Sequence, residues 1–203
     1  MCSWCWGFSP VKAALTEQCR GRALVTLIVG GLHTDWTEPQ DTERKDFLRH
    51  HWDEVHARTG QPFTHDLLER DDFVYNTEAA CRAAVTVREL AGNAKALDFF
   101  SELQRAFYVD NADVTQAEVL TDLAVEFGID GKTFAEHFAS EAMRENTLKD
   151  FQMSRHMGIN GFPTVVVNDA AGYAYLTVGY QPLEALKPVV EQWLEGALER
   201  QAG

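Results

Sequence analysis

The sequence predicts an α/β fold in which a small unit of helices and strands is interrupted by a large all-helical insertion. Three observations predict this organisation. A short apolar run rich in β-branched residues covers 23–29, and it has the composition of a buried strand. Two segments with a hydrophobic period of two follow much later, at 164–168 and 173–178. From residue 66 to about residue 138 the period is helical throughout.

The part before the insertion is expected to hold a helix and a strand. A helical pattern runs from residue 4 to about residue 20, and Pro10 either kinks this helix or marks its first turn. The apolar run at 23–29 is typical of a buried parallel strand. A polar loop follows, and we expect the next helix over 42–59, ended by Gly60.

Within the insertion and after it, helix boundaries can be placed from caps and glycines. Thr115 and Glu118 have the spacing of a capping box, in which each side chain bonds the backbone N–H of the other residue. After the two late strands, which Gly172 and its neighbours should join as a hairpin, a last helix is expected from Pro182 to about Arg200. The remaining helices are expected at 77–91, 93–109, 115–128, 132–139 and 141–157.

Length and charge limit the function classes. At 203 residues the chain favours one domain with an insertion, which we place as 1–33 with 159–203, interrupted by 34–158. The net charge of −13 repels phosphate backbones, so nucleic acid is not an expected partner. No stretch approaches the roughly 18 apolar residues of a membrane span, and no leader precedes the first cysteine. We therefore expect no membrane partner and a cytoplasmic location.

Cys2 and Cys5 form a C-x-x-C pair at the start of the first helix. A thiol in that position faces unpaired backbone N–H groups and the positive end of the helix dipole, and both favour the thiolate. Cys2 would be the attacking sulfur, and Cys5, one turn later, would lie close enough to resolve a mixed disulfide. Trp4, between them, offers an apolar surface for substrate if it is exposed and only packing if it is buried.

The other cysteines and the histidines are interpreted structurally. Zinc would need two more ligands at suitable spacing, and no second C-x-x-C is present, so no metal site is expected. His50, His51 and His56 lie in one charged helix and are expected to face solvent. Cys19 and Cys81 are expected to be small core residues without a redox role.

A proline at the entry of a strand is the second feature with chemical meaning. Pro163 follows Phe162 and precedes Thr164 and an apolar strand. A cis bond before Pro163 would leave the backbone of Phe162 free to pair with an extended substrate. An ordinary trans proline at strand entry is the alternative.

These motifs resemble the DsbA-like branch of the thioredoxin superfamily, and within it the bacterial predicted protein-disulfide isomerases related to the FrnE group. The resemblance implies a thioredoxin-like fold with an inserted helical domain, a nucleophilic Cys2, a resolving Cys5 and a cis-proline at Pro163. Trp4, Phe162 and Thr164 are the expected substrate-binding residues. The resemblance covers nearly the whole chain and is carried by the segments 2–8, 59–63, 76–81 and 158–164.

One departure concerns the strand that precedes the dithiol in this fold. The chain starts one residue before Cys2, so that strand is missing from the sequence. Its absence would leave backbone groups of two neighbouring strands without partners. We expect that the natural polypeptide begins about ten residues earlier, with Met1 an internal methionine, or that another segment fills the gap.

Three functions are compatible with these residues. The leading hypothesis is a thiol–disulfide oxidoreductase or isomerase that acts on protein or small thiol and disulfide substrates, without a bound cofactor and with glutathione as a candidate redox partner. A glutathione-dependent kappa-class transferase or isomerase resembles the same architecture, but that class has serine where this chain has Cys2. A non-catalytic peptide-binding module is the third. The direction of electron flow and the oligomeric state stay open.

Overall fold

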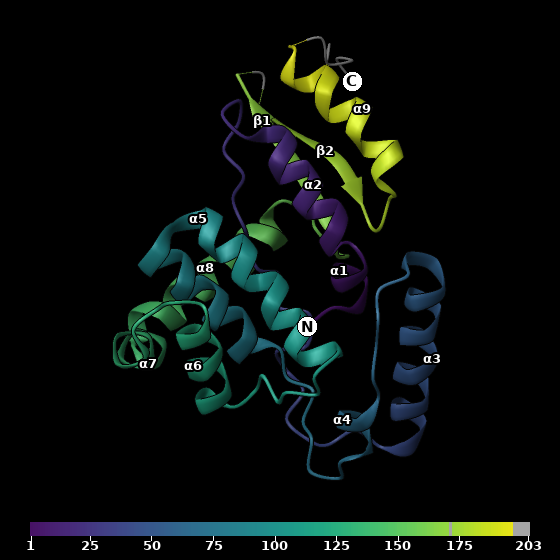
Figure 1. Ribbon diagram of the computed structural model, residues 1–203, viewed down its shortest axis with the longest axis vertical. Coiled ribbons are helices and arrows are strands. Elements are labelled where there is room, and N and C mark those ends of the chain that lie inside the picture. Colours follow the sequence, from purple (N-terminus) through teal and green to yellow (C-terminus); the bar gives the residue numbers. More distant parts are fainter. Residues whose placement is uncertain (171, 197–203) are drawn as a thin grey trace.

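The computed structural model describes residues 1–170 and 172–196, and within them it is mostly helical with one antiparallel hairpin (Figure 1). The hairpin, the N-terminal helices and the last helix form one unit, and the remaining helices form a second, larger group beside it. The helices are α1 (Ser3–Gly7), α2 (Ser9–Cys19), α3 (Thr42–Thr59), α4 (Asp66–Glu69), α5 (Glu78–Tyr108), α6 (Ala117–Glu126), α7 (Gly131–Ala139), α8 (Glu141–His156) and α9 (Leu183–Leu194); the strands are β1 (Thr164–Asp169) and β2 (Gly172–Val178).

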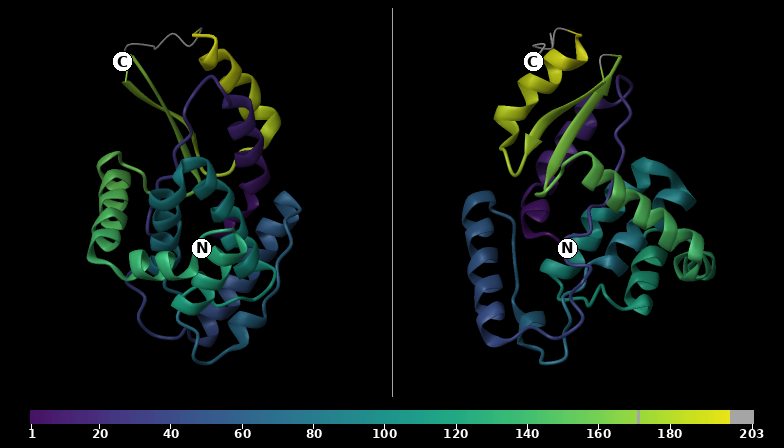
Figure 2. Two further views of the ribbon diagram at one scale, coloured as in Figure 1. Left: turned by 60° about the vertical axis from the view of Figure 1, so that its left-hand side comes forward. Right: turned by 180° about the vertical axis from the view of Figure 1, so that it is seen from behind.

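The hairpin unit packs one face of its two strands against α2 and α9. Thr164 pairs with Val178 and Val165 with Thr177, and a bulge then brings Val166 opposite Tyr175. Apolar residues of α2 and α9 form a common cluster with side chains of both strands, and Figure 2 shows the two helices on the same side of the hairpin. A hairpin and a last helix were expected here, but α9 ends at Leu194, earlier than the expected end near Arg200, and the expected residues 197–200 lie outside the described part.

The segment 23–29 is extended but is not a strand, which corrects the sequence prediction. Its burial alternates, with Val29 buried and Leu24 83% exposed, whereas a parallel strand covered on both faces would be buried throughout. On one side of this segment the backbone bonds the ion-paired side chains of Arg88 and Asp150 instead of a neighbouring strand. Arg88 donates to the Leu27 carbonyl, and the Val29 N–H donates to Asp150 at 3.0 Å.

In the part of the chain that the structure describes, no strand precedes the dithiol, as expected, and β1 pairs only with β2. The middle of β1 is consequently half-buried rather than buried. The sequence pattern identified an extended apolar segment at 23–29 correctly. It could not show that the backbone partner would be a pair of charged side chains.

The helical part follows the predicted boundaries closely, with two differences. The helices expected at 77–91 and 93–109 join as α5, but Gly92 has φ 82° and breaks the regular helix between its two halves. The capping box does not form, because Thr115 donates from its hydroxyl and its N–H to Asp113. α6 therefore begins two residues later, at Ala117.

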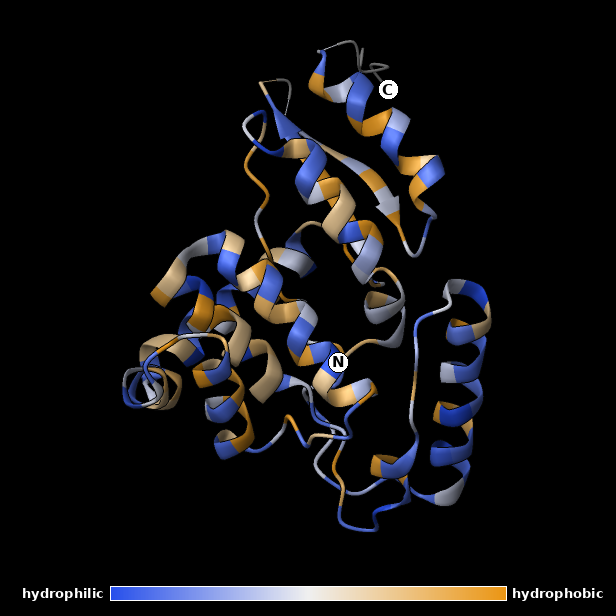
Figure 3. Ribbon diagram, viewed as in Figure 1, coloured by the Kyte–Doolittle hydropathy of each residue, from blue (hydrophilic) through white to orange (hydrophobic). Residues whose placement is uncertain are grey.

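The largest buried side chains lie in the helical part. A cluster around Trp52, Tyr75, Phe99, Phe107 and Tyr108, all 2% exposed or less, joins α3, α5 and the segments between them. Figure 3 shows that α3 is mostly hydrophilic along its length, whereas α5 and α6 mix hydrophobic and hydrophilic residues. Met1 and Trp6 belong to this cluster, whereas Phe8 belongs to the hairpin unit's cluster. The helix that carries the dithiol thus borders both cores.

No helix in residues 1–170 and 172–196 is both long and apolar enough to cross a membrane. The division into 1–33 with 159–203 and an insertion at 34–158 stays a prediction.

Candidate functional site

The dithiol helix is shaped by a proline two turns away. Phe8 separates α1 from α2, and Pro10 occupies the first turn of α2, one of the two outcomes expected from the sequence. Because Pro10 has no N–H, it cannot bond the carbonyl of Trp6, four residues before it. The Trp6 carbonyl accepts a backbone N–H at the end of α1 and, in addition, the side-chain amide of Gln61 at 3.1 Å.

The loop after α3 fixes α1 from the side. The Trp6 indole N–H donates to the Pro62 carbonyl at 2.9 Å, and the indole stacks on Tyr108. A Cβ placed on Gly7 would lie 2.9 Å from a Val55 methyl carbon, so only glycine lets α1 approach α3 this closely. The segment 59–63, which carries part of the family resemblance, therefore anchors the helix that bears both thiols.

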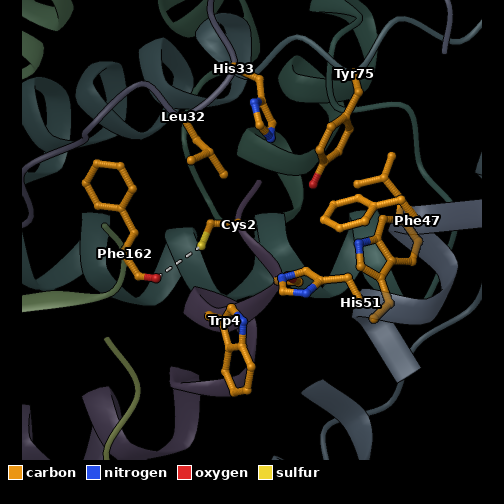
Figure 4. A pocket seen from close by; sticks show the side chains of 11 residues that line it. Cys2, Trp4, Leu32, His33, Phe47, His51, Tyr75 and Phe162 are labelled. Carbon is orange, nitrogen blue, oxygen red and sulfur yellow. Dashed lines mark hydrogen bonds between the residues drawn. The ribbon is translucent and has the colours of Figure 1, made fainter. Parts of the chain in front are cut away.

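Cys2 is the N-cap residue of α1 and lies opposite the loop before β1. Its Sγ donates to the Phe162 carbonyl at 3.7 Å, a contact across 160 residues of sequence (Figure 4). The Cys5 thiol, and the backbone N–H groups of Cys5 and Trp4, lower the pKa of Cys2 from its usual value, and burial opposes them only in part. Cys2 therefore carries more thiolate than a free cysteine at the same pH.

Cys5 has the opposite tendency. The hydrogen bond to the Cys2 sulfur, then burial and the negative charge of Cys2, raise the pKa of Cys5 well above its usual value. Both thiols are free in this structure, and both are half-buried. The two thiols therefore differ in role: Cys2 is stabilised as a thiolate, and Cys5 keeps its proton and donates it to the Cys2 sulfur.

The loop before β1 presents backbone groups to Cys2. The Phe162–Pro163 peptide bond is cis, and Pro163 is buried. The hydroxyl of Thr164 donates to the Gly161 carbonyl at 2.8 Å, and the Pro163 carbonyl accepts from the Gly179 N–H at 2.7 Å. Among the described residues the Phe162 N–H has no acceptor, so it is available to a ligand that approaches Cys2.

A hollow of about 230 Å³ surrounds Cys2. Its wall comes from separate parts of the chain: α1, the loop after 23–29, α3, the segment before α5 and the loop before β1 (Figure 4). Tyr75 lies at one end, and its hydroxyl donates to the Met1 carbonyl at 3.2 Å. The apolar side chains that line the hollow include Leu32, Phe47, Leu48, Trp52 and Phe162.

Trp4 is half-buried, which lies between the exposed substrate surface and the buried packing residue considered from the sequence. Its ring contacts Tyr180 with centroids 5.8 Å apart and the edge of His51 at 6.0 Å. His51 was expected to face solvent with His50 and His56, but it is half-buried in the wall of the hollow and stacks on Phe47. Figure 4 shows Trp4 and His51 on the same side of the Cys2 sulfur.

His33 is a site residue that the sequence did not single out. It stacks on Trp36 with ring centroids 3.8 Å apart, and burial lowers the pKa of His33 to about 4. The imidazole next to the thiols is therefore neutral at physiological pH and does not stabilise the thiolate by charge. No short motif marks His33, because the turn that carries it meets Cys2 only through the fold.

The remaining candidate residues lie where the sequence suggested. Cys19 and Cys81 are buried in two different apolar clusters. Within the described residues, no group of three or more His, Cys, Asp or Glu side chains is arranged to hold a metal ion.

Comparison with protein families and solved structures gives a consistent picture. A family model described as thioredoxin matches residues 1–188. A crystal structure of a candidate protein disulfide isomerase from Nitrosomonas europaea is 39% identical with a TM-score of 0.89, and the match covers 97% of this chain and 94% of that one. The cytosolic disulfide reductase DsbM from Pseudomonas aeruginosa is 26% identical with a TM-score of 0.80, over 97% of this chain and 96% of its own. DsbM has also been solved with glutathione.

Curated relatives carry a different description. The ClpXP adapter protein SpxH of Halalkalibacterium halodurans is 24% identical over 209 residues, which cover 99% of this chain and 67% of the relative. SpxH of Bacillus subtilis is 21% identical over 165 residues, covering 81% of this chain and 54% of the relative. The chain thus spans about half to two thirds of the length of these relatives.

Proposed function

Because the chain belongs to the thioredoxin family, we propose that it is a thiol–disulfide oxidoreductase in which Cys2 attacks and Cys5 resolves. The observation that carries the proposal is the position of the Cys2 sulfur. Cys2 is the N-cap residue of α1, where the Cys5 thiol and the backbone N–H groups of Cys5 and Trp4 lower its pKa, and its sulfur lies 3.7 Å from the Phe162 carbonyl oxygen. A thiolate is the nucleophile in disulfide exchange, and this is the more acidic of the two adjacent thiols.

The reaction cycle has two exchange steps. The Cys2 thiolate attacks one sulfur of a substrate disulfide, forms a mixed disulfide and releases the other substrate sulfur as a thiolate. Cys5 then loses its proton and attacks the Cys2 sulfur, which releases the second substrate thiolate and leaves a Cys2–Cys5 disulfide. The same steps in reverse oxidise a dithiol substrate, so the geometry serves both directions.

Substrate contact is proposed at Trp4, Phe162 and Thr164. The available Phe162 N–H would pair with an extended segment of the substrate next to its reactive sulfur. Trp4 would supply a flat apolar surface, since half of it lies beside the hollow around Cys2. Thr164 holds the loop in shape through its bond to Gly161.

Glutathione is the redox partner that we propose for regeneration. The DsbM structure with glutathione supports this choice, because its match covers 96% of this chain. The hollow of about 230 Å³ beside Cys2 has room for part of a tripeptide, and reduced glutathione would reopen the Cys2–Cys5 disulfide by two successive exchanges. The cytosolic description of DsbM agrees with the cytoplasmic location that we propose.

Two variants test the proposal. Cys2→Ala should abolish reduction of insulin by the protein in the presence of glutathione. Cys5→Ser should accumulate a mixed disulfide between Cys2 and the substrate, visible by mass spectrometry and reversed by dithiothreitol, because no resolving thiol remains. Unchanged insulin reduction in Cys2→Ala would reject the proposal. Glutathione conjugation retained in Cys2→Ser would instead favour a kappa-class transferase.

An adapter role is the second candidate function. The SpxH relatives, described as ClpXP adapters, match nearly the full chain at low identity and favour it. An adapter would bind a protein substrate without turnover of the dithiol. Substrate delivery to ClpXP that is equally fast for the wild type and for Cys2→Ala/Cys5→Ala would support this role and leave the dithiol unexplained.

A further inference from the structure

Lys12 is a buried cation that the exchange chemistry has not used so far. It lies in α2, and its Nζ points into the seam with α5 rather than into solvent. There it donates to the Leu97 carbonyl and to the Ser101 hydroxyl, both at 2.6 Å, and lies 5.5 Å from the centroid of the Phe100 ring. No carboxylate of the described residues lies within ion-pair distance of it.

A buried ammonium without a carboxylate partner is disfavoured, and the lowered pKa of Lys12 reflects this. Burial lowers this pKa to about 8, while the negative charges of Asp98 and of an ionised Cys5 oppose the shift. The attraction between the Lys12 ammonium and an ionised Cys5 also favours the Cys5 thiolate, although Cys2, burial, the Met1 amino group and Cys81 act on Cys5 more strongly. A methionine or leucine would pack in this seam without that penalty.

Helix geometry places Lys12 on the Cys5 side of the dithiol helix. The chain continues from α1 to α2 with bonds from the Phe8 N–H to the Trp4 carbonyl and from the Lys12 N–H to the Phe8 carbonyl. Cys5, Ser9 and Lys12 are four and three residues apart and therefore share one face. The Ser9 hydroxyl donates to Ser101 at 3.1 Å, the same α5 side chain that accepts from Lys12.

We propose that Lys12 is a positioning residue that promotes ionisation of the resolving Cys5, and thereby the second exchange step. The inference rests on the proposed dithiol function. The Cys5 proton passes to bulk water, the Cys5 thiolate forms a bond to the Cys2 sulfur, and the bond from Cys2 to the substrate breaks. The departing substrate thiolate takes up a proton from water, so the step needs no further reactant.

The charged and titratable groups around the pair come from three segments. Cys5 is faced by Cys2 of α1, Cys81 of α5 and the amino group of Met1. Lys12 is faced by Asp98 of α5 and by Cys5. Of these groups, Lys12 is the one side-chain cation, so its removal changes the balance at Cys5 without touching Cys2 chemistry directly.

The test follows resolution alone, with Ellman's reagent as the substrate disulfide. Attack by Cys2 releases a first thionitrobenzoate, and attack by Cys5 on the resulting mixed disulfide releases a second. At neutral pH, Lys12→Met should slow the second release about tenfold and shift its pH dependence upward, because a unit charge is lost from a low-dielectric site. The first release should keep its rate, and Lys132→Met, which removes an exposed lysine of α7, should leave both releases unchanged.

Three results separate the possible failures. A second release with the same rate and pH midpoint in Lys12→Met as in the wild type would overturn the inference. If Lys12→Met does not give a folded circular dichroism spectrum, Lys12→Gln removes the same charge and can still donate to Leu97, and the same expectations apply to it. Absence of the first release in the wild type would reject the dithiol function itself.

Discussion

The helical part and the hairpin unit differ in how completely they bury their side chains. In the helical part, Phe107, Leu103 and Tyr108 are fully buried, whereas the best-buried residue that the last helix contributes to the hairpin unit, Val190, is 3% exposed. The middle residues of β1 are only half-buried. Cys2 and Cys5 lie where the two parts meet. We infer that the helical part supplies most of the stability and the hairpin unit supplies the backbone loop opposite the thiols.

The Arg88–Asp150 pair, between α5 and α8, holds the extended segment 27–29 against the helical part. Arg88 makes a bidentate contact with Asp150, at 2.7 and 2.9 Å, and both residues also bond the backbone of 27–29. Arg88→Met should lower the free energy of unfolding by about 3–5 kcal/mol, because it leaves the buried Asp150 carboxylate without a counter-charge. Urea denaturation measures the change.

The double variant Arg88→Met/Asp150→Leu is the control for that experiment. It removes both charges and should recover a large part of the loss. A single variant as stable as the wild type would show that the pair does not hold the segment 27–29 against the helical part.

Two leucines compare the cores directly. Leu103 in α5 is fully buried and Leu186 in α9 is 4% exposed. Leucine-to-alanine changes cost about 2–5 kcal/mol, depending on how far the surroundings can relax. We expect Leu103→Ala near the upper end and Leu186→Ala near the lower end, measured by urea denaturation. An equal or larger loss for Leu186→Ala would reverse the assignment of stability to the helical part.

Gly30 tests how the hairpin unit positions its loop. A Cβ on Gly30 would lie 2.0 Å from the Phe162 ring, so Gly30→Ala must push that ring aside. Because the Phe162 carbonyl faces Cys2, we expect kcat/KM for insulin reduction to fall about tenfold, a loss of about 1.4 kcal/mol in transition-state stabilisation. Circular dichroism should stay unchanged. Full activity in Gly30→Ala would mean that the exact position of Phe162 is unimportant.

His33 should give the smallest effect, seen as a pH dependence of stability. Burial lowers its pKa from 6.5 in an exposed state to about 4 in the folded protein, so between these values the unfolded chain binds more protons. The contribution of neutral, buried His33 to the free energy of unfolding is fully present above about pH 6.5 and is lost as the pH falls towards 4. The melting temperature of His33→Phe should fall less steeply over this range than that of the wild type. The exposed His50, changed to Asn, is the matched control and should behave like the wild type.

Local signals predicted most of the fold. Gly60 placed the end of α3, and a period of two placed both strands of the hairpin. The segment 23–29 was misassigned because its backbone partners, Arg88 and Asp150, come from helices far along the chain. The Thr115 capping box failed for a local reason, because Asp113, two residues earlier, accepts from both the N–H and the hydroxyl of Thr115.

The candidate site was predicted in part. Cys2, Cys5 and Phe162 were named from short motifs, and the structure places them together. Their catalytic and substrate-binding roles stay proposals. His33 and His51 were missed as neighbours of the thiol, because they reach the hollow from a turn and a helix that carry no distinctive motif.

The most direct test of the account is the pH dependence of alkylation at the two active-site cysteines. The reduced protein is treated briefly with iodoacetamide across a range of pH, and mass spectrometry separates modification at Cys2 from modification at Cys5. We predict that Cys2 reaches its full rate at a lower pH than a free cysteine does, and that Cys5 reaches its own only at a higher pH. If Cys2 titrates like a free cysteine, or if Cys5 proves the more acidic thiol, the assignment of attacking and resolving sulfurs is wrong.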